Sequence, residues 1–437
     1  MDNKYDVNRR SFVQGAAAAG LSTLTLANNL QAQAGGSDVV KFGLIGCGGR
    51  GTGAASQIMN SEHPTRLVAM ADAFMDKVEG SHGRLSKQYK DKVTVTKDSM
   101  FAGFDAAQNV INSDVDLVVL ATPPGFRPFH LEAAIAAGKH VFMEKPVCVD
   151  GAGAQKVLEA TAAAKKKNLA IGVGLQRRHQ PNYMETIKRL QDGAIGDILY
   201  MRAFWNGGGV WTRARQPEQS ELEYQMRNWY YFNWLCGDHI TEQHIHNLDV
   251  INWLKNAFPV KANGMGGREV RGNPANDKDA KEHGEIFDHH FVEYEYADGT
   301  RMYSQCRHQR NCFNSVSEHA YGSKGYSDIN RSIIMADEPW KFRGKNVSGH
   351  QQEQLDLVDT LAKGEVYNEG EYGAMSSMTS VLGRLATYSG KIVSMDQALK
   401  TKSTMPDNIS WNSEAPVSPD EHGFYAAAAI PGNYRIS

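Results

Sequence analysis

A glycine-rich segment directly after a short apolar run is the feature that most constrains the fold. The apolar run covers residues 39–45, and the segment that follows it reads Gly46-Cys47-Gly48-Gly49-Arg50-Gly51. In the pattern G-x-G-x-x-G the first glycine permits a tight turn, the second lets the backbone approach a pyrophosphate, and the third lets the next helix pack closely on the strand. The N-terminus of that helix offers N–H groups and a partial positive charge to phosphate. The segment therefore predicts a strand, a turn and a helix that bind a dinucleotide.

Apolar runs and helical patterns alternate through the next 130 residues. We predict strands at residues 39–45, 66–71, 115–121, 140–143 and 170–174, and helices at 128–137 and 152–167. Such alternation is typical of a doubly wound parallel sheet, whose ligands bind at the carboxyl ends of the strands. Residues 38–175 are therefore predicted to form a dinucleotide-binding domain.

Asp72 ends the second predicted strand, about as far from the glycines as a ribose-binding carboxylate should be. A carboxylate there accepts hydrogen bonds from a ribose 2′-hydroxyl and repels a 2′-phosphate, which favours NAD over NADP. Arg50 is the residue that argues the other way, because a basic side chain near the adenosine can pair with a phosphate. The alternative for Asp72 is a helix cap without contact to a nucleotide.

The pattern changes after residue 176. Strands are predicted at 198–204, 291–296 and 301–307, the last two joined by a turn at 297–300. This favours an antiparallel sheet with helices on one side. Residues 176–437 are predicted to form a second α/β domain that binds substrate and mediates oligomerisation, ending in an extended tail from about residue 410.

The first 34 residues have the features of an export signal. Residues 8–14 (NRRSFVQ) resemble the twin-arginine motif, a mild apolar run covers residues 15–26, and Ala32-Gln33-Ala34 fits a cleavage site. The apolar run is too short to span a bilayer. We expect a periplasmic or otherwise exported protein that uses the twin-arginine machinery and keeps no membrane span after processing. The alternative is an unstructured N-terminus.

Composition excludes some classes of partner. The net charge is −2, which gives no reason to expect nucleic acid. Five scattered cysteines do not have the spacing of a metal finger or a disulfide framework.

Three further segments carry a resemblance to a known family. They are Ala121-Thr122-Pro123-Pro124, then His130, and then residues 137–146, which read AGKHVFMEKP. Together they resemble the Gfo/Idh/MocA family, which includes glucose-fructose oxidoreductase and inositol dehydrogenase. The resemblance implies a Rossmann domain, a C-terminal α/β domain with a large, mostly antiparallel open sheet, and a homodimer or homotetramer. We assign to the cofactor site the six motif positions Thr122, Pro123, His130, Glu144, Lys145 and Asp72, together with the glycine loop.

The resemblance places Lys145 near the nicotinamide and the substrate hydroxyl. Oxidation of a carbinol requires a group that accepts the hydroxyl proton. Burial and a neighbouring nicotinamide cation would both help a lysine to lose its own proton. Alternatively, Lys145 keeps its charge and orients the hydroxyl while another group accepts the proton.

Residues 237–253 resemble the family segment in which an aspartate precedes a histidine by four residues. Here the histidine is His246, and Glu242 stands where the family has aspartate. On one continuous helix His239, Glu242, His246 and Asp249 would share a face. We assign His246 as the acid/base partner and Glu242 as its orienting neighbour. The alternatives are a helix end that faces solvent and a metal site built on Glu242 and His246, although our assignment includes no metal.

The substrate site is predicted from a basic segment and an aromatic segment. Arg178 and His239 are assigned to substrate hydroxyls, although for Arg178 a salt bridge between domains is equally compatible. The segment 205–234 is rich in Trp and Tyr, whose rings suit the C–H face of a sugar. We select Trp211 from it; core packing is the alternative for any one of these rings.

These features predict an exported, NAD-dependent oxidoreductase that acts on a sugar, glycoside or cyclic polyol. Because free NAD is scarce outside the cytoplasm, a tightly bound and recycled nucleotide is expected. An NAD-dependent glycoside hydrolase that works through transient oxidation and elimination is one alternative. A nucleotide- or sugar-binding protein without turnover is the other.

Overall fold

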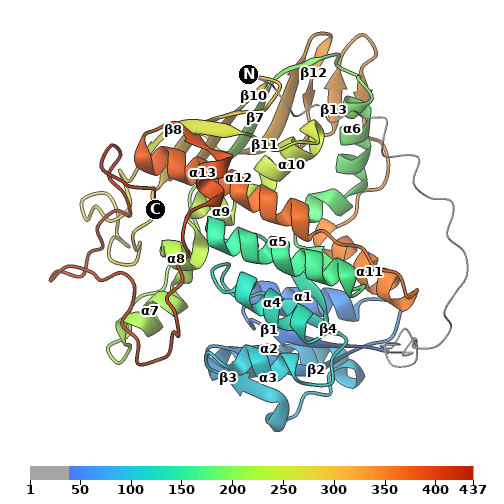
Figure 1. Ribbon diagram of the computed structural model, residues 1–437, viewed down its shortest axis with the longest axis vertical. Helices are drawn as coiled ribbons and strands as arrows, with labels where there is room; N and C mark the ends of the chain where they lie inside the picture. The colour runs from blue at the N-terminus through green and yellow to red at the C-terminus, as the bar shows by residue number, and fades with distance from the viewer. Residues whose placement is uncertain (1–38, 437) are drawn as a thin grey trace, which may run out of the picture. The chain divides into compact units, whose positions relative to one another are not determined.

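The computed structural model describes residues 39–436, and the predicted export signal at 1–34 lies outside them. Two sheets organise the chain (Figure 1). The first has the strand order β3 (Met100–Ala102), β2 (Thr65–Asp72), β1 (Val40–Ile45), β4 (Leu117–Leu120), β5 (His140–Met143) and β6 (Ile171–Val173). All its pairings are parallel, as predicted. The order 3-2-1-4-5-6 is that of a Rossmann sheet.

Helices connect and cover this first sheet. They are α1 (Gly49–Met59), α2 (Met75–Tyr89), α3 (Ala106–Ile111), α4 (Arg127–Ala136) and α5 (Gly151–Lys166). A later helix, α11 (Gly349–Ala362), packs against α1, and its Leu357 and Val358 join the buried cluster of Phe42 and Leu44. The predicted boundary at residue 175 therefore leaves out one helix that the chain returns to this sheet.

The second sheet has nine strands and is mostly antiparallel. Its order is β14 (Trp340–Lys341), β13 (Ile333–Met335), β12 (Gly325–Asp328), β11 (Ser315–Gly322), β7 (Ile198–Gly207), β10 (Arg301–His308), β9 (His289–Glu295), β8 (Lys261–Gly267) and β15 (Val393–Ser394). The predicted hairpin of β9 and β10 is confirmed, with its turn at 297–300. The pair β7 and β10 is parallel.

The remaining helices lie on one side of this sheet or beside it. They are α6 (Pro181–Gln191), α7 (Glu221–Arg227), α8 (Asn233–Cys236), α9 (His239–Glu242), α10 (Ile245–Lys255), α12 (Gly370–Ser389) and α13 (Met395–Leu399). Helix α12 packs on β8 and β9 and also on α5, next to which it lies in Figure 1. One buried hydrophobic cluster consequently runs from Val118 in the first sheet through Val157 and Leu382 to Val292 in the second.

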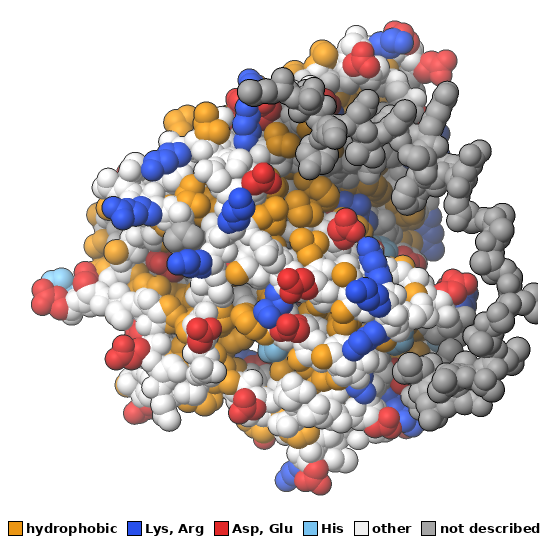
Figure 2. Space-filling model, in the orientation of Figure 1, with side chains coloured by type: hydrophobic (Ala, Val, Ile, Leu, Met, Phe, Trp, Pro, Cys, Tyr) orange, Lys and Arg blue, Asp and Glu red, His pale blue; other side chains and the backbone are white. Residues whose placement is uncertain are grey.

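Two surface properties bear on partners. Acidic and basic side chains are interspersed over the face shown in Figure 2, in keeping with the net charge of −2. Within residues 39–436 none of the helices has the length and apolar character that crossing a bilayer requires.

Candidate functional site

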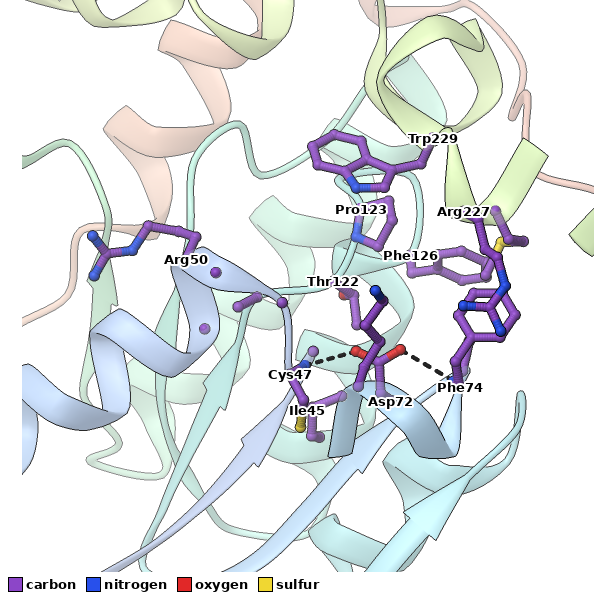
Figure 3. A pocket seen from close by; sticks show the side chains of 18 of the residues that line it. Ile45, Cys47, Arg50, Asp72, Phe74, Thr122, Pro123, Phe126, Arg227 and Trp229 are labelled. Carbon is purple, nitrogen blue, oxygen red and sulfur yellow. Dashed lines mark hydrogen bonds between the residues drawn. The ribbon is translucent and has the colours of Figure 1, made fainter. Parts of the chain in front are cut away.

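One cavity of about 820 Å³ runs along the carboxyl ends of the first strands and reaches the second half of the chain. The residues that line it come from the glycine loop, the end of β2, the loop after β4 and the segment 210–243. Of the predicted site residues, it is lined by Gly46, Gly48, Gly49, Arg50, Gly51, Asp72, Thr122, Pro123, His130, Trp211 and Glu242. Most of the predicted cofactor residues are thus brought together in one place (Figure 3).

The glycine loop has the shape that a pyrophosphate requires. A Cβ atom on Gly51 would lie 1.9 Å from the carbonyl oxygen of Gly46, so the third glycine is needed for close packing. Gly46 has φ +98°, a conformation that favours glycine. A Cβ on Gly48 or Gly49 would instead meet no atom within 4 Å, because both face open space at the N-terminus of α1. That free volume is where phosphate oxygens would meet the helix N–H groups.

Asp72 is held in place at the end of β2. Its Oδ2 accepts a hydrogen bond from the backbone N–H of Cys47 at 2.7 Å, and its Oδ1 accepts one from Phe74 at 3.1 Å (Figure 3). Burial raises the pKa of Asp72, although these two hydrogen bonds oppose the rise. Each carboxylate oxygen retains a lone pair for a ribose hydroxyl. The position of Asp72 therefore fits an adenosine whose ribose hydroxyls are free.

Arg50 does not compete with this reading. Its Nε lies 2.8 Å from Glu144 Oε1, and its guanidinium also donates to Gln57. Figure 3 shows the side chain pointing away from Asp72. Glu144, which is 1% exposed, therefore supports the glycine loop through Arg50 and does not line the cavity.

His130 and Thr122 form a small polar contact in the wall of the cavity. His130 Nδ1 lies 3.3 Å from Thr122 Oγ1, and its ring stacks on Phe126 with 6.0 Å between centroids. Burial lowers the pKa of His130 to about 4, so this imidazole is neutral at physiological pH.

Lys145 joins the two halves of the chain. Its Nζ donates to the backbone carbonyl of Glu242 at 2.6 Å and lies 3.0 Å from Glu242 Oε1. Both side chains are mostly buried, and Glu242 lines the cavity. Glu242 therefore pairs with Lys145, whereas it was assigned from the sequence as the orienting neighbour of His246. Among the described residues, the group of side chains close enough to hold a metal ion is Asp238, His239 and His290, and it does not include Glu242 or His246.

The helix predicted across this segment is interrupted. Helix α9 ends at Glu242 and α10 begins at Ile245, so His239, Glu242, His246 and Asp249 do not share one continuous face, contrary to the prediction. His246 is 8% exposed and packs on Trp205 with 6.0 Å between ring centroids. Burial, then the charge of Lys145, hold the pKa of His246 well below its usual value. Its imidazole is therefore neutral, and His246 lies outside the residues that line the cavity.

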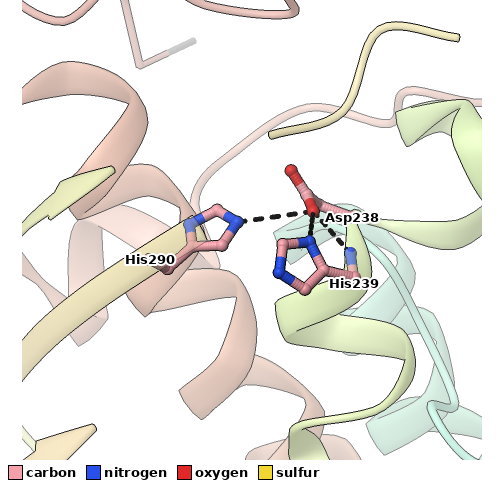
Figure 4. A group of neighbouring side chains, drawn as sticks. All are labelled: Asp238, His239 and His290. Carbon is pink, nitrogen blue, oxygen red and sulfur yellow. Dashed lines mark hydrogen bonds and ion pairs between the residues drawn. The ribbon is translucent and has the colours of Figure 1, made fainter. Parts of the chain in front are cut away.

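Asp238 explains how α9 is anchored (Figure 4). Its φ is +71°, and its carboxylate accepts hydrogen bonds from His239 Nδ1 at 2.7 Å and from the backbone N–H of Phe287 at 3.0 Å. Tyr388 also donates to it, and His290 Nε2 lies 3.4 Å away. Burial alone would raise the pKa of Asp238, but the charges and hydrogen bonds of the two histidines hold it well below its usual value. Asp, His and His are ligands that zinc accepts, yet this carboxylate is already surrounded by donors, which favours an anchor.

Two of the predicted substrate residues lie elsewhere. His239 is fully buried on Asp238 and does not line the cavity, so its assignment to substrate is wrong. Arg178 makes a two-pronged salt bridge to Asp249, with N···O distances of 2.9 and 2.8 Å, and its guanidinium lies 4.0 Å from the Tyr372 ring centroid. Arg178 therefore forms a salt bridge, which was the stated alternative to its assignment to substrate hydroxyls. Trp211 does line the cavity.

Sequence reasoning missed part of the cavity wall. Phe74 and Phe104 line it beside Asp72, and Tyr230 and Gln243 line it beside Glu242. Phe74 lies only two residues after Asp72, so its position in the sequence could have identified it as part of the cavity wall. Tyr230 is one of several neighbouring aromatic residues, and the sequence offers no means of choosing among them.

Comparison with known proteins agrees with the geometry. Residues 40–175 match the sequence model of the Gfo/Idh/MocA oxidoreductase family with an NAD-binding Rossmann fold. An inositol 2-dehydrogenase from Rhizobium meliloti (strain 1021) is 28% identical over 221 residues, which is 51% of this chain and 56% of that protein. One from Saccharopolyspora erythraea is 32% identical over 162 residues, 37% of this chain and 44% of that protein. The match thus spans about half the length of these relatives.

Solved structures extend the likeness to both halves of the chain. Aldose-aldose oxidoreductase from Caulobacter crescentus, complexed with glycerol, has a TM-score of 0.62 at 20% identity and covers 81% of this chain and 99% of its own. Scyllo-inositol dehydrogenase from Lactobacillus casei, with NAD(H) and scyllo-inositol bound, has a TM-score of 0.61 at 20% identity and covers 82% and 99%. At this identity the likeness establishes the fold. Residues 40–175 therefore form a Rossmann domain that matches the NAD-binding model of the Gfo/Idh/MocA oxidoreductases, and an α/β unit with a mostly antiparallel sheet follows it.

Proposed function

We propose that the protein is an exported, NAD-dependent oxidoreductase that oxidises a carbinol of a sugar, glycoside or cyclic polyol. One observation carries the proposal: a single cavity joins the glycine loop and Asp72 to Glu242, whose carboxylate is paired with Lys145. The relatives named above act on inositol, and the Caulobacter protein acts on aldoses, which supports a polyhydroxylated substrate.

The side chains divide the work on the substrate hydroxyl. Bound NAD would supply the acceptor for the hydride of the carbinol carbon. Lys145 spends two of its N–H bonds on Glu242 and has a third for the hydroxyl oxygen of the substrate. An ammonium held in this way orients the hydroxyl. His246, whose buried Nδ1 has no hydrogen-bond partner among the described residues, would receive the hydroxyl proton. The sequence left two roles open for Lys145: to accept the hydroxyl proton, or to keep its charge and orient the hydroxyl. The geometry favours the second role.

Coverage of the cleft supports a nucleotide that is retained between turnovers. Residues Trp211, Arg213 and Trp229, which lie outside the Rossmann sheet, line the same cavity as Asp72. The C-terminal tail adds Trp411, whose ring lies 5.3 Å from Phe74 and 4.7 Å from Phe104. Together with export by the twin-arginine machinery, which carries folded proteins, this favours a cofactor loaded before export and recycled in place.

The open face of the nine-stranded sheet supports a homodimer or homotetramer. Large apolar side chains are exposed on its strands and the adjoining loop, among them Leu199, Met265 and Phe313 at 59, 73 and 73%. Exposed apolar area of this kind is typical of an interface between protein chains.

The test uses the purified protein without added nucleotide. We expect denaturation to release NAD, and we expect scyllo-inositol, glucose or a methyl glucoside to raise the NADH absorbance band of the native protein. Lys145→Ala should abolish the rise, whereas Lys188→Ala, at an exposed lysine of α6, should leave it intact. The absence of both bound nucleotide and any spectral change, with or without added NAD, would refute the redox proposal. Release of methanol from the glucoside would identify the hydrolytic alternative.

A further inference from the structure

Tyr230 has a buried hydroxyl that the fold leaves without a partner. The residue belongs to the short 3-10 turn η4 (Trp229–Tyr231), is 3% exposed and lines the cavity. Its Oη has no hydrogen-bond partner among the described residues. An unsatisfied buried hydroxyl is costly, so a position that keeps one calls for a ligand to complete it.

The ring of Tyr230 is packed among other aromatic rings. Trp229 lies 5.8 Å away between ring centroids, Tyr231 lies 5.5 Å away and Trp211 lies 6.2 Å away. His308 stacks on the ring at 6.1 Å with 20° between the planes. His308 is fixed in turn by Gln243 Oε1, which lies 2.7 Å from its Nε2. Aromatic neighbours therefore surround the ring of Tyr230, while its hydroxyl has no partner among the described residues.

A second unpartnered oxygen belongs to the same cavity. Glu242 uses Oε1 for Lys145, while its buried Oε2 has no hydrogen-bond partner among the described residues. Burial, and after it the negative charge of Glu242, raise the pKa of Tyr230 well above its usual value. The phenol therefore keeps its proton and is a donor, and the carboxylate oxygen is an acceptor.

We propose that Tyr230 Oη and Glu242 Oε2 form a subsite for a neutral polyol, in which the phenol donates to one substrate hydroxyl and the carboxylate accepts from another. The subsite rests on the proposed function and deepens it, because it selects the substrate class. A hydroxyl group both donates and accepts, so a polyol satisfies the two orphaned atoms. A sugar acid whose carboxylate reached Oε2 could not satisfy that oxygen, because an ionised carboxylate has no proton to donate.

Tyr230→Phe tests the subsite because it removes the hydroxyl and keeps the ring. Binding of scyllo-inositol and glucose to the NAD-loaded protein is measured by titration calorimetry, alongside bound NAD content and thermal stability. We expect the affinity for the polyol that binds the wild type to fall at least tenfold, with NAD content and stability unchanged. The control is Tyr326→Phe, at an exposed tyrosine of β12, which should bind polyol as the wild type does.

Other outcomes separate this subsite from the proposed function. If the wild type binds a polyol without reducing its nucleotide, the redox proposal fails, and weaker binding by Tyr230→Phe still supports the subsite. Undiminished affinity in Tyr230→Phe would overturn the subsite, as would failure of the wild type to bind either polyol. Glucuronate provides a second test. We expect the wild type to bind glucuronate more weakly than glucose, and we expect Glu242→Gln to reduce this difference in affinity. Equal binding of glucose and glucuronate by the wild type would contradict the role of Glu242.

Discussion

The glycine loop makes opposite predictions for two alanine substitutions that lie three residues apart. In Gly51→Ala the new Cβ would lie 1.9 Å from the Gly46 carbonyl oxygen and 3.0 Å from the Ala121 Cβ, whereas ordinary contacts begin near 3.4 Å. The backbone must move by about the difference, and overpacking of this kind costs about 1–3 kcal/mol. In Gly48→Ala the Cβ meets no atom within 4 Å, so the fold should tolerate it. That Cβ would instead enter the volume assigned to the pyrophosphate.

The two variants are compared by urea unfolding and by NAD titration. We expect Gly51→Ala to lose about 1–3 kcal/mol of unfolding free energy in the apo protein. Gly48→Ala should match the wild type in stability and bind NAD at least tenfold more weakly, which corresponds to about 1.4 kcal/mol. If Gly48→Ala binds NAD with wild-type affinity, the pyrophosphate does not lie over this loop and the reasoning fails.

Three further predictions concern stability and cofactor retention. Arg178→Met should cost about 3–5 kcal/mol of unfolding free energy, because it leaves the buried carboxylate of Asp249 unpaired, and KM for the polyol should not change; a raised KM at full stability would restore a substrate role. Burial lowers the pKa of His239 to about 4 and that of His244 to about 3, against about 6.5 in an unfolded chain. Below pH 6.5 the unfolded state therefore binds protons that the folded state does not, and stability should fall by about 1.4 kcal/mol per pH unit for each group as the pH drops towards 4; urea midpoints that stay constant between pH 7 and 5 would contradict this. Trp411→Ala should speed the loss of bound NAD during gel filtration without altering its chemistry, and unchanged retention would exclude the tail from holding the nucleotide.

The Rossmann half of the fold could be predicted because its signals are local. Buried parallel strands appear as continuous apolar runs, and the glycine pattern together with Asp72 locates the turn at which they bind a ligand. Strand β3 was missed because Met100–Ala102 is too short to form such a run. The order of the nine-stranded sheet depends on pairings between distant segments, such as the parallel pair β7 and β10, which leave no periodic trace.

Two features of the second half are hard to predict from sequence, each for a specific physical reason. Helix α12 is almost wholly buried, yet it is rich in Ser and Thr, so it shows no apolar stripe; its Ser377 and Thr379 hydroxyls donate to carbonyls one turn earlier. Asp238 at positive φ caps the start of α9, and the break before α10 falls at Gln243 and His244, whose side chains contact His308 and Ser304. A sequence pattern does not show those distant contacts, and so the shared helical face was predicted in error.

The same limit applies to the candidate site. Glu242 was identified because it departs from the family motif, but its partner Lys145 lies 97 residues earlier in the chain, and the pair emerges only when the two halves fold together. Arg178 and His239 were selected by residue type and neighbourhood. Arg178 pairs with Asp249 and His239 pairs with Asp238, so both side chains have a structural role.

Transfer of an isotopic label tests the central claim most directly. NAD-loaded protein is mixed with scyllo-inositol that carries deuterium on its carbinol carbons, the single turnover is quenched, and the released nucleotide is weighed by mass spectrometry. We predict reduced nucleotide that carries one deuterium, in an amount that Lys145→Ala abolishes. Reduced nucleotide without deuterium, or turnover of the polyol with no reduced nucleotide at any time, would contradict hydride transfer in this cavity.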